Sequence, residues 1–412
     1  MRLIPVMLAL LLALSPGAVA LQASAPTAPA SDVAEQTAAE RTDNDTVQPA
    51  PDGNTTSVMT LGTDPTRAGF HSPSLSLGDS LTMDRDGFRT QLSVAELDQQ
   101  LASAETDEDK KRILNRYRFR IENQIISLQA KEERVTSAFS NGTISEREYL
   151  RTLGQIDAKA AEIETLIDAL KAHGQSTGFG IDDNSLKTKL TSVQGPVRDQ
   201  IAKATRGSGE SPRVYVETTN NGVVLSTIID GTYVREILRS DRRDPSQTAN
   251  IGRDEVREKI IRPQYPWIVD NWTGSDRRVY PSVQVIRFSY TYSHGSLTAY
   301  VDTGTESVFR EIQHKRLTGE NSLPPRPGVV NSSDNVTLTV NRTYPGGPLR
   351  VQLTNETGAP LRGQITVAGE PVGRTNAEGV LWTLGPAEQF AVSATHEDAM
   401  VNVTATPVDA ES

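Results

Sequence analysis

Apolar residues in the first half of the chain recur with a helical period. Leu114, Ile121, Leu128 and Val135 stand seven residues apart. A second series follows a 4-3 spacing, with polar residues at most intervening positions: Tyr149, Leu153, Ile156, Ala160, Ile163, Ile167 and Leu170. Because this spacing places the apolar side chains on one side of a helix, it predicts two long helices that pack as an antiparallel hairpin.

A third, weaker series of apolar residues follows the other two, and Gly195-Pro196 interrupts it. Its members are Leu186, Leu190, Val193, Val197 and Ile201. These residues can pack against the hairpin, so residues 91–205 are expected to form a helical hairpin or a three-helix coiled coil. An ordinary three-helix bundle would use the same core residues and remains an alternative.

Capping residues predict where these helices begin and end. Ser93–Glu96 and Ser145–Glu148 are capping boxes, in which a serine and a glutamate three residues later satisfy free backbone N–H groups. Thr106 can begin a further helix. The pairs Asn141-Gly142 and His173-Gly174 suit the left-handed conformation that ends many helices. We therefore expect helices to begin at these caps and to end at these glycines.

Residues 213–320 change to the pattern of strands. Runs with a period of two, or fully apolar runs, cover Arg213–Glu217, Val223–Ile229, Tyr233–Leu238, Val283–Tyr292, Leu297–Val301 and Ser307–Ile312. One short helical pattern, Asp254–Ile261, is expected to stop at Pro263. These elements predict an α+β domain with an antiparallel sheet.

Short alternating blocks continue over residues 330–408. Six blocks, separated by glycine-containing turns, centre on Leu338, Val351, Ile365, Trp382, Val392 and Val403. This spacing predicts a small, immunoglobulin-like β-sandwich. Since Trp382 alternates with Val380 and Leu384, we expect its indole in the core. The fold class is thus a multidomain α+β chain: helices, an antiparallel-sheet α+β domain and a C-terminal β-sandwich.

The N-terminus reads as a secretory leader. Arg2 precedes an apolar run from Leu3 to Leu14, and Ala18-Val19-Ala20 has the A-x-A form of a cleavage site. We expect cleavage after Ala20; the alternative, a membrane anchor, would need a longer apolar run. No later segment suits a membrane span. Residues 21–90 are rich in Ala, Ser, Thr and Pro and acidic, so a disordered spacer is expected there.

Composition narrows the classes of function. The chain has no cysteine, which removes disulfides, thiolate metal sites and cysteine nucleophiles. The net charge of −10 argues against nucleic acid as a partner. Only ten of the 42 basic residues are lysines, a bias that an extracellular protein of a halophile with a GC-rich genome would show and that codon composition alone could also produce. The expected partner is an unidentified protein at the cell surface.

No motif in the sequence points to catalysis, a cofactor or a metal. The five histidines follow no metal-ligand spacing: His71, His173, His294, His314 and His396. The oxygen-rich run Ile181–Ser185 lacks the glycine and distal glutamate of a calcium loop, so we interpret it as a helix cap at Asp183 or Asn184. The aromatic cluster Tyr265-Pro266-Trp267, with Trp272, is interpreted as core packing, with a binding groove as the alternative. We therefore predict that the chain is not an enzyme.

N-glycosylation sequons are the one candidate site class that exceeds background. Nine of the seventeen asparagines begin an Asn-x-Ser/Thr sequon: Asn44, Asn54, Asn141, Asn271, Asn331, Asn335, Asn341, Asn355 and Asn402. Such an excess is typical of a glycosylated surface protein, because the sequon is the acceptor in exported chains. Threonine-rich strands explain part of this excess, because they raise the local chance of a sequon.

Three stretches resemble known families. Leu297–Val308 is similar to the strand-turn-strand of PepSY-type domains, although its turn is two residues shorter. Gly358–Leu384 resembles the transthyretin-like or carboxypeptidase-regulatory-like repeats of extracellular proteins. Asp230–Glu236 and His294–Gln313, with the order of the parts, resemble an uncharacterised family of secreted haloarchaeal proteins. The last likeness implies a secreted compartment and an archaeal organism, and no activity. Together with the leader and the sequons, it leads us to expect a secreted, glycosylated cell-surface protein with a structural or interaction role. The alternative is a PepSY-like modulator of an extracellular protease.

Overall fold

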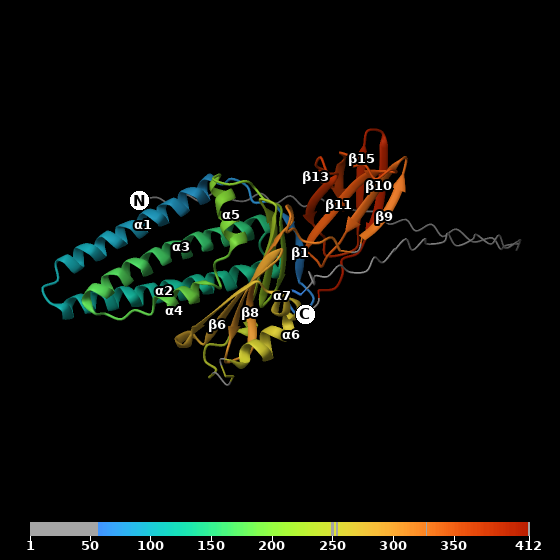
Figure 1. The fold of residues 1–412 in the computed structure, drawn as a ribbon. Coiled ribbons are helices and arrows are strands. Elements are labelled where there is room, and N and C mark those ends of the chain that lie inside the picture. Colours follow the sequence, from blue (N-terminus) through green and yellow to red (C-terminus); the bar gives the residue numbers. More distant parts are fainter. Residues whose placement is uncertain (1–56, 249–250, 253, 327, 411–412) are drawn as a thin grey trace, which may run out of the picture. The chain divides into compact units, whose positions relative to one another are not determined.

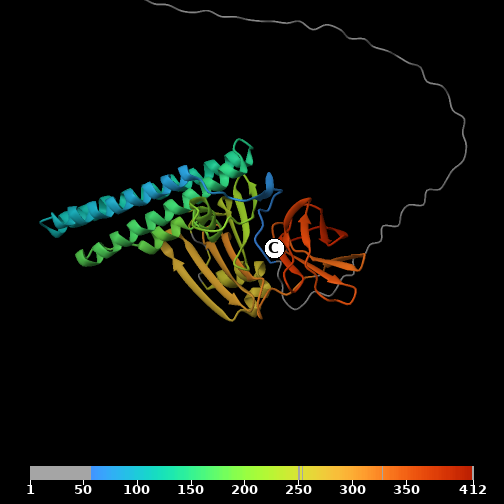
Figure 2. The same ribbon diagram turned by 90° about the horizontal axis from the view of Figure 1, so that it is seen from above.

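The helical region begins earlier than the sequence pattern suggests. The structure is a computed structural model that describes residues 57–248, 251–252, 254–326 and 328–410. The leader, Ala20 and the first part of the expected spacer lie outside these residues. The helices run α1 Leu77–Ala102, α2 Asp107–Ser140, α3 Glu146–Thr177, α4 Asp183–Leu190 and α5 Pro196–Arg206. Helices α1, α2 and α3 lie side by side (Figures 1 and 2).

The helical core confirms the predicted hairpin of α2 and α3. One buried cluster joins residues of both helices to α1 and α4, among them Leu114, Ile121, Leu128, Ile156, Ile163, Ile167 and Leu170. Leu97 and Leu101 bring α1 against this core, and Leu186 and Leu190 bring α4. The seven-residue recurrence in α2 and the 4-3 spacing in α3 therefore identified the inward side of each long helix.

Two of the predicted helix starts are confirmed and one is wrong. The side chains of Thr106 and Ser145 accept the N–H of the third residue of α2 and α3. Ser93, in contrast, lies inside α1 and its hydroxyl donates to the carbonyl of Arg89. The N-cap of α1 is Ser76. The box at Ser93 was misleading because α1 exposes large apolar residues that break its amphipathic pattern.

The helix ends were also partly mispredicted. Gly142 has a φ of +73° directly after α2, as expected. Helix α3, however, continues past Gly174 to Thr177 and ends at Gly178, whose φ is +64°. A Cβ at position 174 would lie 2.7 Å from the carbonyl oxygen of Phe179, so this glycine allows the chain to fold back closely. The N-cap of α4 is Asp182, one residue before the expected position.

A single antiparallel sheet forms the centre of the described chain. Its strand order is β1-β2-β3-β4-β8-β7-β6-β5. The strands are β1 Arg67–His71, β2 Val214–Thr219, β3 Gly222–Ile229, β4 Thr232–Arg239, β5 Gly274–Tyr280, β6 Val285–Tyr292, β7 Gly295–Asp302 and β8 Ser307–Arg316. The predicted antiparallel-sheet domain is confirmed, with two additional strands at its edges.

The two additional strands, β1 and β5, escaped the sequence analysis for different reasons. Strand β5 is mostly polar and exposed, so it carries no apolar alternation. Strand β1 lies within the segment expected to be a disordered spacer. In the structure, residues 57–90 of that segment form β1, the start of α1 and a buried stretch that includes Val58, Met59 and Leu61. The expected spacer is therefore wrong from residue 57 onward.

The two faces of the sheet are covered by different elements. Helices α2, α3 and α5 pack on one face, through a cluster that contains Phe139, Tyr149 and Val197. The other face is covered by Met59 and Leu61, a π-helical turn Arg257–Ile261, and the short helices α6 (Arg262–Gln264) and α7 (Pro266–Asn271). Pro263 does not stop this helical stretch, because it stands in the first turn of α6, where its missing N–H is not needed.

The C-terminal residues form the predicted β-sandwich. One sheet has the order β14-β11-β10-β9 and the other β13-β12-β15-β16. The strands are β9 Gly328–Ser333, β10 Val336–Asn341, β11 Pro348–Asn355, β12 Gln364–Val367, β13 Glu370–Arg374, β14 Val380–Leu384, β15 Phe390–His396 and β16 Ala399–Ala405. The six predicted blocks match six of these strands.

Trp382 does not lie in the sandwich core. It packs instead with Leu384 against Tyr215 and Tyr233 of the central sheet, while Leu381 faces the sandwich core. The alternation in β14 was read with the wrong phase, because both sides of this strand carry apolar residues. Trp382 thus belongs to the contact between the sandwich and the central sheet.

Candidate functional site

A cluster of four buried charges lies where the helices meet the central sheet. Arg198 comes from α5, Glu132 from α2, Glu236 from β4 and Arg310 from β8. Arg198 Nη2 lies 2.6 Å from a carboxylate oxygen of Glu132, and its Nε lies 3.0 Å from Glu236. Arg310 Nη2 lies 3.9 Å from Glu236 and donates to the carbonyl of Gln194. Each of the four side chains is almost fully buried.

Burial dominates the electrostatics of this cluster. It raises the pKa of Glu132 and of Glu236, while Arg198 acts in the opposite direction on both carboxyls. Among the residues that the structure describes, no cation contacts the neighbouring carboxyl of Asp157, and burial raises its pKa to about 7. This carboxyl accepts a hydrogen bond from the N–H of Gly195, at 2.9 Å. Asp157 is therefore poised to change its charge near neutral pH.

A cavity of about 510 Å³ lies beside the cluster, between α2, α4 and the sheet. Its apolar lining includes Val283, Val285 and Phe309. Its polar lining includes Gln129, Ser192 and Asn221, and Glu132 belongs to its wall. A cavity of this size and mixed lining is of the kind that holds small molecules in other proteins.

The opposite face of the same two strands carries a second buried network. Glu311 of β8 accepts from the backbone N–H of Met59 at 2.6 Å, from the hydroxyl of Tyr265 at 2.7 Å and from Arg235 of β4 at 2.8 Å. Arg235 also donates to the carbonyl of Met59 at 2.8 Å. One carboxylate and one guanidinium thus bind Met59, and the side chains of Gln313 and Arg239 donate to the neighbouring carbonyls of Ser57 and Thr60, so the segment before β1 is held against the sheet.

This second network extends to the sandwich. Lys315 of β8 is buried, which lowers its pKa to about 7, and it donates to the hydroxyl of Tyr344 at 3.0 Å. The carbonyl of Gly346 accepts from Ser226 at 2.6 Å and from Tyr233 at 3.1 Å. The loop between β10 and β11 is therefore attached to the central sheet by hydrogen bonds.

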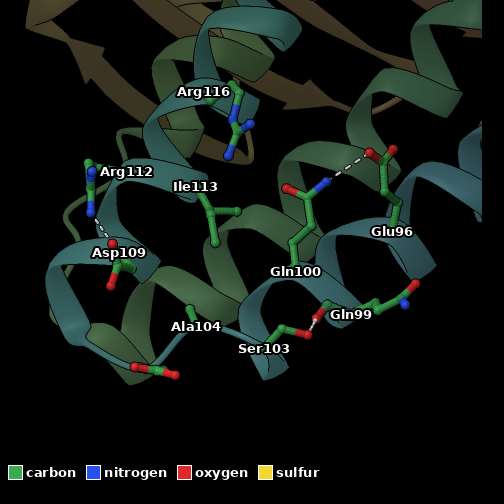
Figure 3. Close-up of a pocket in the computed structure, with 10 residues that line it drawn as sticks. Glu96, Gln99, Gln100, Ser103, Ala104, Asp109, Arg112, Ile113 and Arg116 are labelled. Atoms are coloured by element: carbon green, nitrogen blue, oxygen red, sulfur yellow. Dashed lines mark hydrogen bonds and ion pairs between the residues drawn. The ribbon is translucent and has the colours of Figure 1, made fainter.

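A larger and more open cavity, of about 990 Å³, lies between the end of α1 and the start of α2 (Figure 3). The polar side chains that line it bind one another along their own helices: Arg112 pairs with Asp109, and Gln100 donates to Glu96 at 2.8 Å. Ser103 donates to the carbonyl of Gln99. These pairs lie within single helices and stabilise the end of α1 and the start of α2. The cavity brings together none of the residues predicted to be functional.

The structure sorts the predicted sequons by accessibility. Asn44 and Asn54 lie outside the described residues. Five sequon asparagines are exposed: Asn141, Asn271, Asn331, Asn335 and Asn402. Asn355 is half-buried. Asn341 is buried; its amide donates to the carbonyl of Arg326 at 2.7 Å, and its oxygen accepts from Arg350. In the folded protein the side chain of Asn341 is therefore engaged.

The aromatic cluster largely follows the core-packing interpretation. Tyr265 is fully buried, and Trp267 packs at the edge of the same cluster. His294 packs against the rings of Trp267 and Tyr292, which also contact each other, and burial lowers its pKa to about 4. Trp272 remains 40% exposed. Within the described ranges, no three His, Asp or Glu side chains are placed to hold a metal ion.

The residues of the two charge networks were not anticipated from the sequence. A signal for them does exist: Arg235-Glu236 and Arg310-Glu311 are each flanked by apolar residues in the middle of a predicted strand. Because side chains alternate between the faces of a strand, each pair must send one charge to each side of the sheet. A charged pair inside an apolar run therefore indicates buried ion pairs on both faces.

Comparison with known proteins yields three family matches. A family model described as a domain of unknown function, DUF7096, matches residues 1–210. A family of unknown function, DUF7094, matches residues 214–320. An archaeal fibronectin-III type-like domain matches residues 328–403, in agreement with the predicted sandwich and the expected archaeal source. None of the three supports the PepSY or transthyretin resemblance. No curated protein and no solved structure matches the chain.

Proposed function

The chain belongs to the DUF7096 family, and from this premise we propose that it is a secreted, N-glycosylated cell-surface protein of a halophilic archaeon with a structural or protein-interaction role. The observation that carries the proposal is the archaeal fibronectin-III-like module, joined to a helical region through a central sheet. The leader-like N-terminus and the nine sequons of the sequence support export to the surface. In the described residues, no helix is long and apolar enough to cross a bilayer.

The buried networks suit a structural role. Ion pairs that join α2, α5, β4 and β8 give the helices one defined position on the sheet, since any shift would leave a buried charge without its partner. The hydrogen bonds of Tyr344 and Gly346 do the same for the sandwich. A scaffold of this kind presents its surfaces in a fixed arrangement.

Export can be tested on the native protein. Mass spectrometry of protein from the cell surface should find Leu21 as the first residue, because the A-x-A site ends at Ala20. Protease treatment of intact cells should digest the protein and spare a cytoplasmic marker. A chain that retains Met1, or that resists digestion until the cells are lysed, would contradict the proposal.

Glycosylation is tested by a matched pair of sequon variants. Asn402→Gln removes an exposed sequon and should increase gel mobility, because one glycan is lost. Asn341→Gln removes a sequon whose asparagine is buried in the sandwich, and its mobility should equal that of the wild type. Equal mobility of the wild type and a variant lacking all the exposed sequons would remove the glycan from the proposal.

A second candidate function is modulation of an extracellular protease. The observation that favours it is the strand-turn-strand of β7 and β8, the segment that resembles PepSY domains. In its turn, Asp302 accepts from the N–H groups of Gly304 at 2.7 Å and Thr305 at 3.1 Å. Purified protein added to the secreted peptidases of the same organism should slow peptide hydrolysis under this second proposal and leave it unchanged under the first.

A further inference from the structure

The outer side of α1 carries large apolar side chains that the rest of the described chain leaves uncovered. Leu77 is 72% exposed, Leu81 and Phe88 are each 60% exposed, and Leu92 is 53% exposed. We call these four residues the α1 stripe. Scattered exposed apolar residues are common, but four large apolar side chains along one side of one helix are unusual for a surface that contacts only water.

Helical geometry places the stripe opposite the packed side of α1. At about 100° per residue, the four positions fall within a narrow sector of the helix. Met83, Leu97 and Leu101, which contact the rest of the bundle, fall on the other side. Helix α1 lies at the outside of the bundle in both ribbon views (Figures 1 and 2). The stripe therefore faces away from the helices that α1 packs against.

Opposite charges border the stripe at its midpoint. Asp84 and Arg85 lie between Leu81 and Phe88 in sequence, and both are exposed. Because successive residues are 100° apart, Asp84 stands at one edge of the stripe and Arg85 at the other. Within the described part of the chain, neither makes an ion pair.

We propose that the α1 stripe is the contact surface for a second copy of this chain, in a two-fold dimer whose α1 helices run parallel. Rotation about an axis along the helices brings the negative edge of one copy to the positive edge of the other. Asp84 of each copy then faces Arg85 of its partner at nearly the same height, and Leu81 and Phe88 pack between these two pairs.

The charges select this arrangement from the alternatives. In an antiparallel pair the same edges meet, so Asp84 would face Asp84 and Arg85 would face Arg85. A parallel pair converts both repulsions into attractions and buries the same leucines and phenylalanine. The inference goes beyond the proposed surface role and does not depend on it, because purified protein is sufficient to test it.

The first experiment measures the mass of the exported chain by light scattering after size exclusion. We expect twice the mass of one chain. The double variant Leu81→Asp/Phe88→Asp should be monomeric with an unchanged circular dichroism spectrum, since both side chains are exposed in one copy. Met400→Asp, at another exposed apolar residue, should stay dimeric. A monomeric wild type, or a dimeric double variant, overturns the proposal.

The second experiment exchanges the edge charges at about 0.15 M salt, where exposed pairs are not fully screened. Asp84→Arg or Arg85→Asp alone should weaken dimerisation by about tenfold, because two attractive pairs become repulsive. The double exchange Asp84→Arg/Arg85→Asp should restore it. If the double exchange is no tighter than the single variants, Asp84 does not face Arg85 and the parallel pairing is wrong.

The third experiment uses the absence of natural cysteine. Leu77→Cys should form disulfide-linked dimers under mild oxidation, because position 77 meets itself in a parallel pair. In an antiparallel pair it would lie beside position 92, about 20 Å from its copy.

A wild type that dimerises only after deletion of residues 21–56 would assign the stripe to that segment of the same chain and contradict the proposal.

Discussion

The two faces of strands β4 and β8 both bury an ion pair, but they differ in the hydrogen bonds that the buried charges make. Both faces bury an Arg and a Glu from adjacent strands. On the face away from the long helices, Glu311 accepts three hydrogen bonds, one of them from a backbone N–H. On the helical face, both carboxylate oxygens of Glu132 and one of Glu236 lack a well-aligned hydrogen bond within the described chain, although Arg198 lies close to both residues.

For a buried charged group, balance of charge and satisfaction of its hydrogen bonds are therefore separate requirements. The helical-face cluster is balanced in charge, with two arginines and two glutamates, but it holds its parts mainly by Coulomb attraction. The Glu311 network adds aligned donors, and these make a buried carboxylate most favourable. We therefore expect the network around Glu311 to contribute more to stability, and the helical-face cluster to define position more than it stabilises.

The same substitution on the two faces gives the largest expected effect. Glu311→Leu leaves Arg235 buried without its partner and frees the N–H of Met59 and the hydroxyl of Tyr265, so the free energy of unfolding should fall by about 5 kcal/mol. Glu236→Leu should lower it by about 3 kcal/mol, because Arg198 keeps Glu132. Urea unfolding measures both. If both variants lose the same free energy of unfolding, the two faces do not differ in how much their buried charges stabilise the protein.

Removal of Arg198 tests how far the helical-face cluster depends on one cation. Arg198→Met leaves Glu132 buried without its cation and leaves Glu236 with only Arg310, at 3.9 Å, and should cost about 4 kcal/mol. A triple variant with Glu132→Leu and Glu236→Leu in addition should recover part of this loss, since apolar replacements avoid the desolvation of three charges and leave only Arg310, which still donates to the carbonyl of Gln194. If the triple variant is as unstable as Arg198→Met, the ion pairs of the helical-face cluster contribute net stability, and the expected difference from the Glu311 network is wrong.

Asp157 should give the helical face a distinctive pH dependence. Its folded pKa, about 7, lies above the unfolded value, so the folded state binds more protons and stability should fall as the pH rises from about 4 to 7. Asp157→Asn keeps an acceptor for Gly195 and should remove this fall, which adds about 3 kcal/mol above pH 7. Unfolding curves at pH 4 and pH 8 measure the difference, and a variant with the wild-type slope would contradict it.

Lys315 should give the opposite face the reverse dependence, with a smaller net effect. Its folded pKa, about 7, lies below the unfolded value, so the unfolded state binds more protons and stability should rise with pH between about 7 and 10. Lys315→Met should flatten this rise and stabilise the protein by about 2 kcal/mol at pH 7, the lost hydrogen bond to Tyr344 offsetting part of the gain. Unfolding curves at pH 7 and pH 10 measure this rise in stability. A rise that is the same in Lys315→Met and in the wild type would contradict the prediction.

The sequence predicted the elements whose two sides differ in polarity. Helices α2 and α3 have one clear apolar side, the inner strands of the sheet have alternating or fully apolar runs, and the positions of all these elements were correct to within a few residues. Strand β5 was missed because it is polar on both sides, and Trp382 was misplaced because β14 is apolar on both. Where both sides of an element are alike, periodicity carries no information about its environment.

The buried networks were beyond the sequence analysis because their partners are distant in the chain. Arg198 and Glu236 are contributed by different layers, and Glu311 meets the backbone of Met59 only when residues 57–61 cross the sheet. The sequence shows that Arg310-Glu311 interrupts an apolar strand, but it does not show what compensates each charge. Similarly, the sequons could be recognised, whereas the burial of Asn341 depends on its contacts with Arg326 and Arg350.

Strand β1 has a consequence for how the chain folds and for where its families are divided. His71 and Val214 are direct partners in the ladder of β1 and β2, so all the helices α1 to α5 are an insertion between two adjacent strands. The boundary between the two matched families, at residues 210–214, separates partners of one ladder. Neither segment contains the whole sheet. The helices, whose contacts are more local, are then expected to assemble first and to bring β1 to the sheet late in folding.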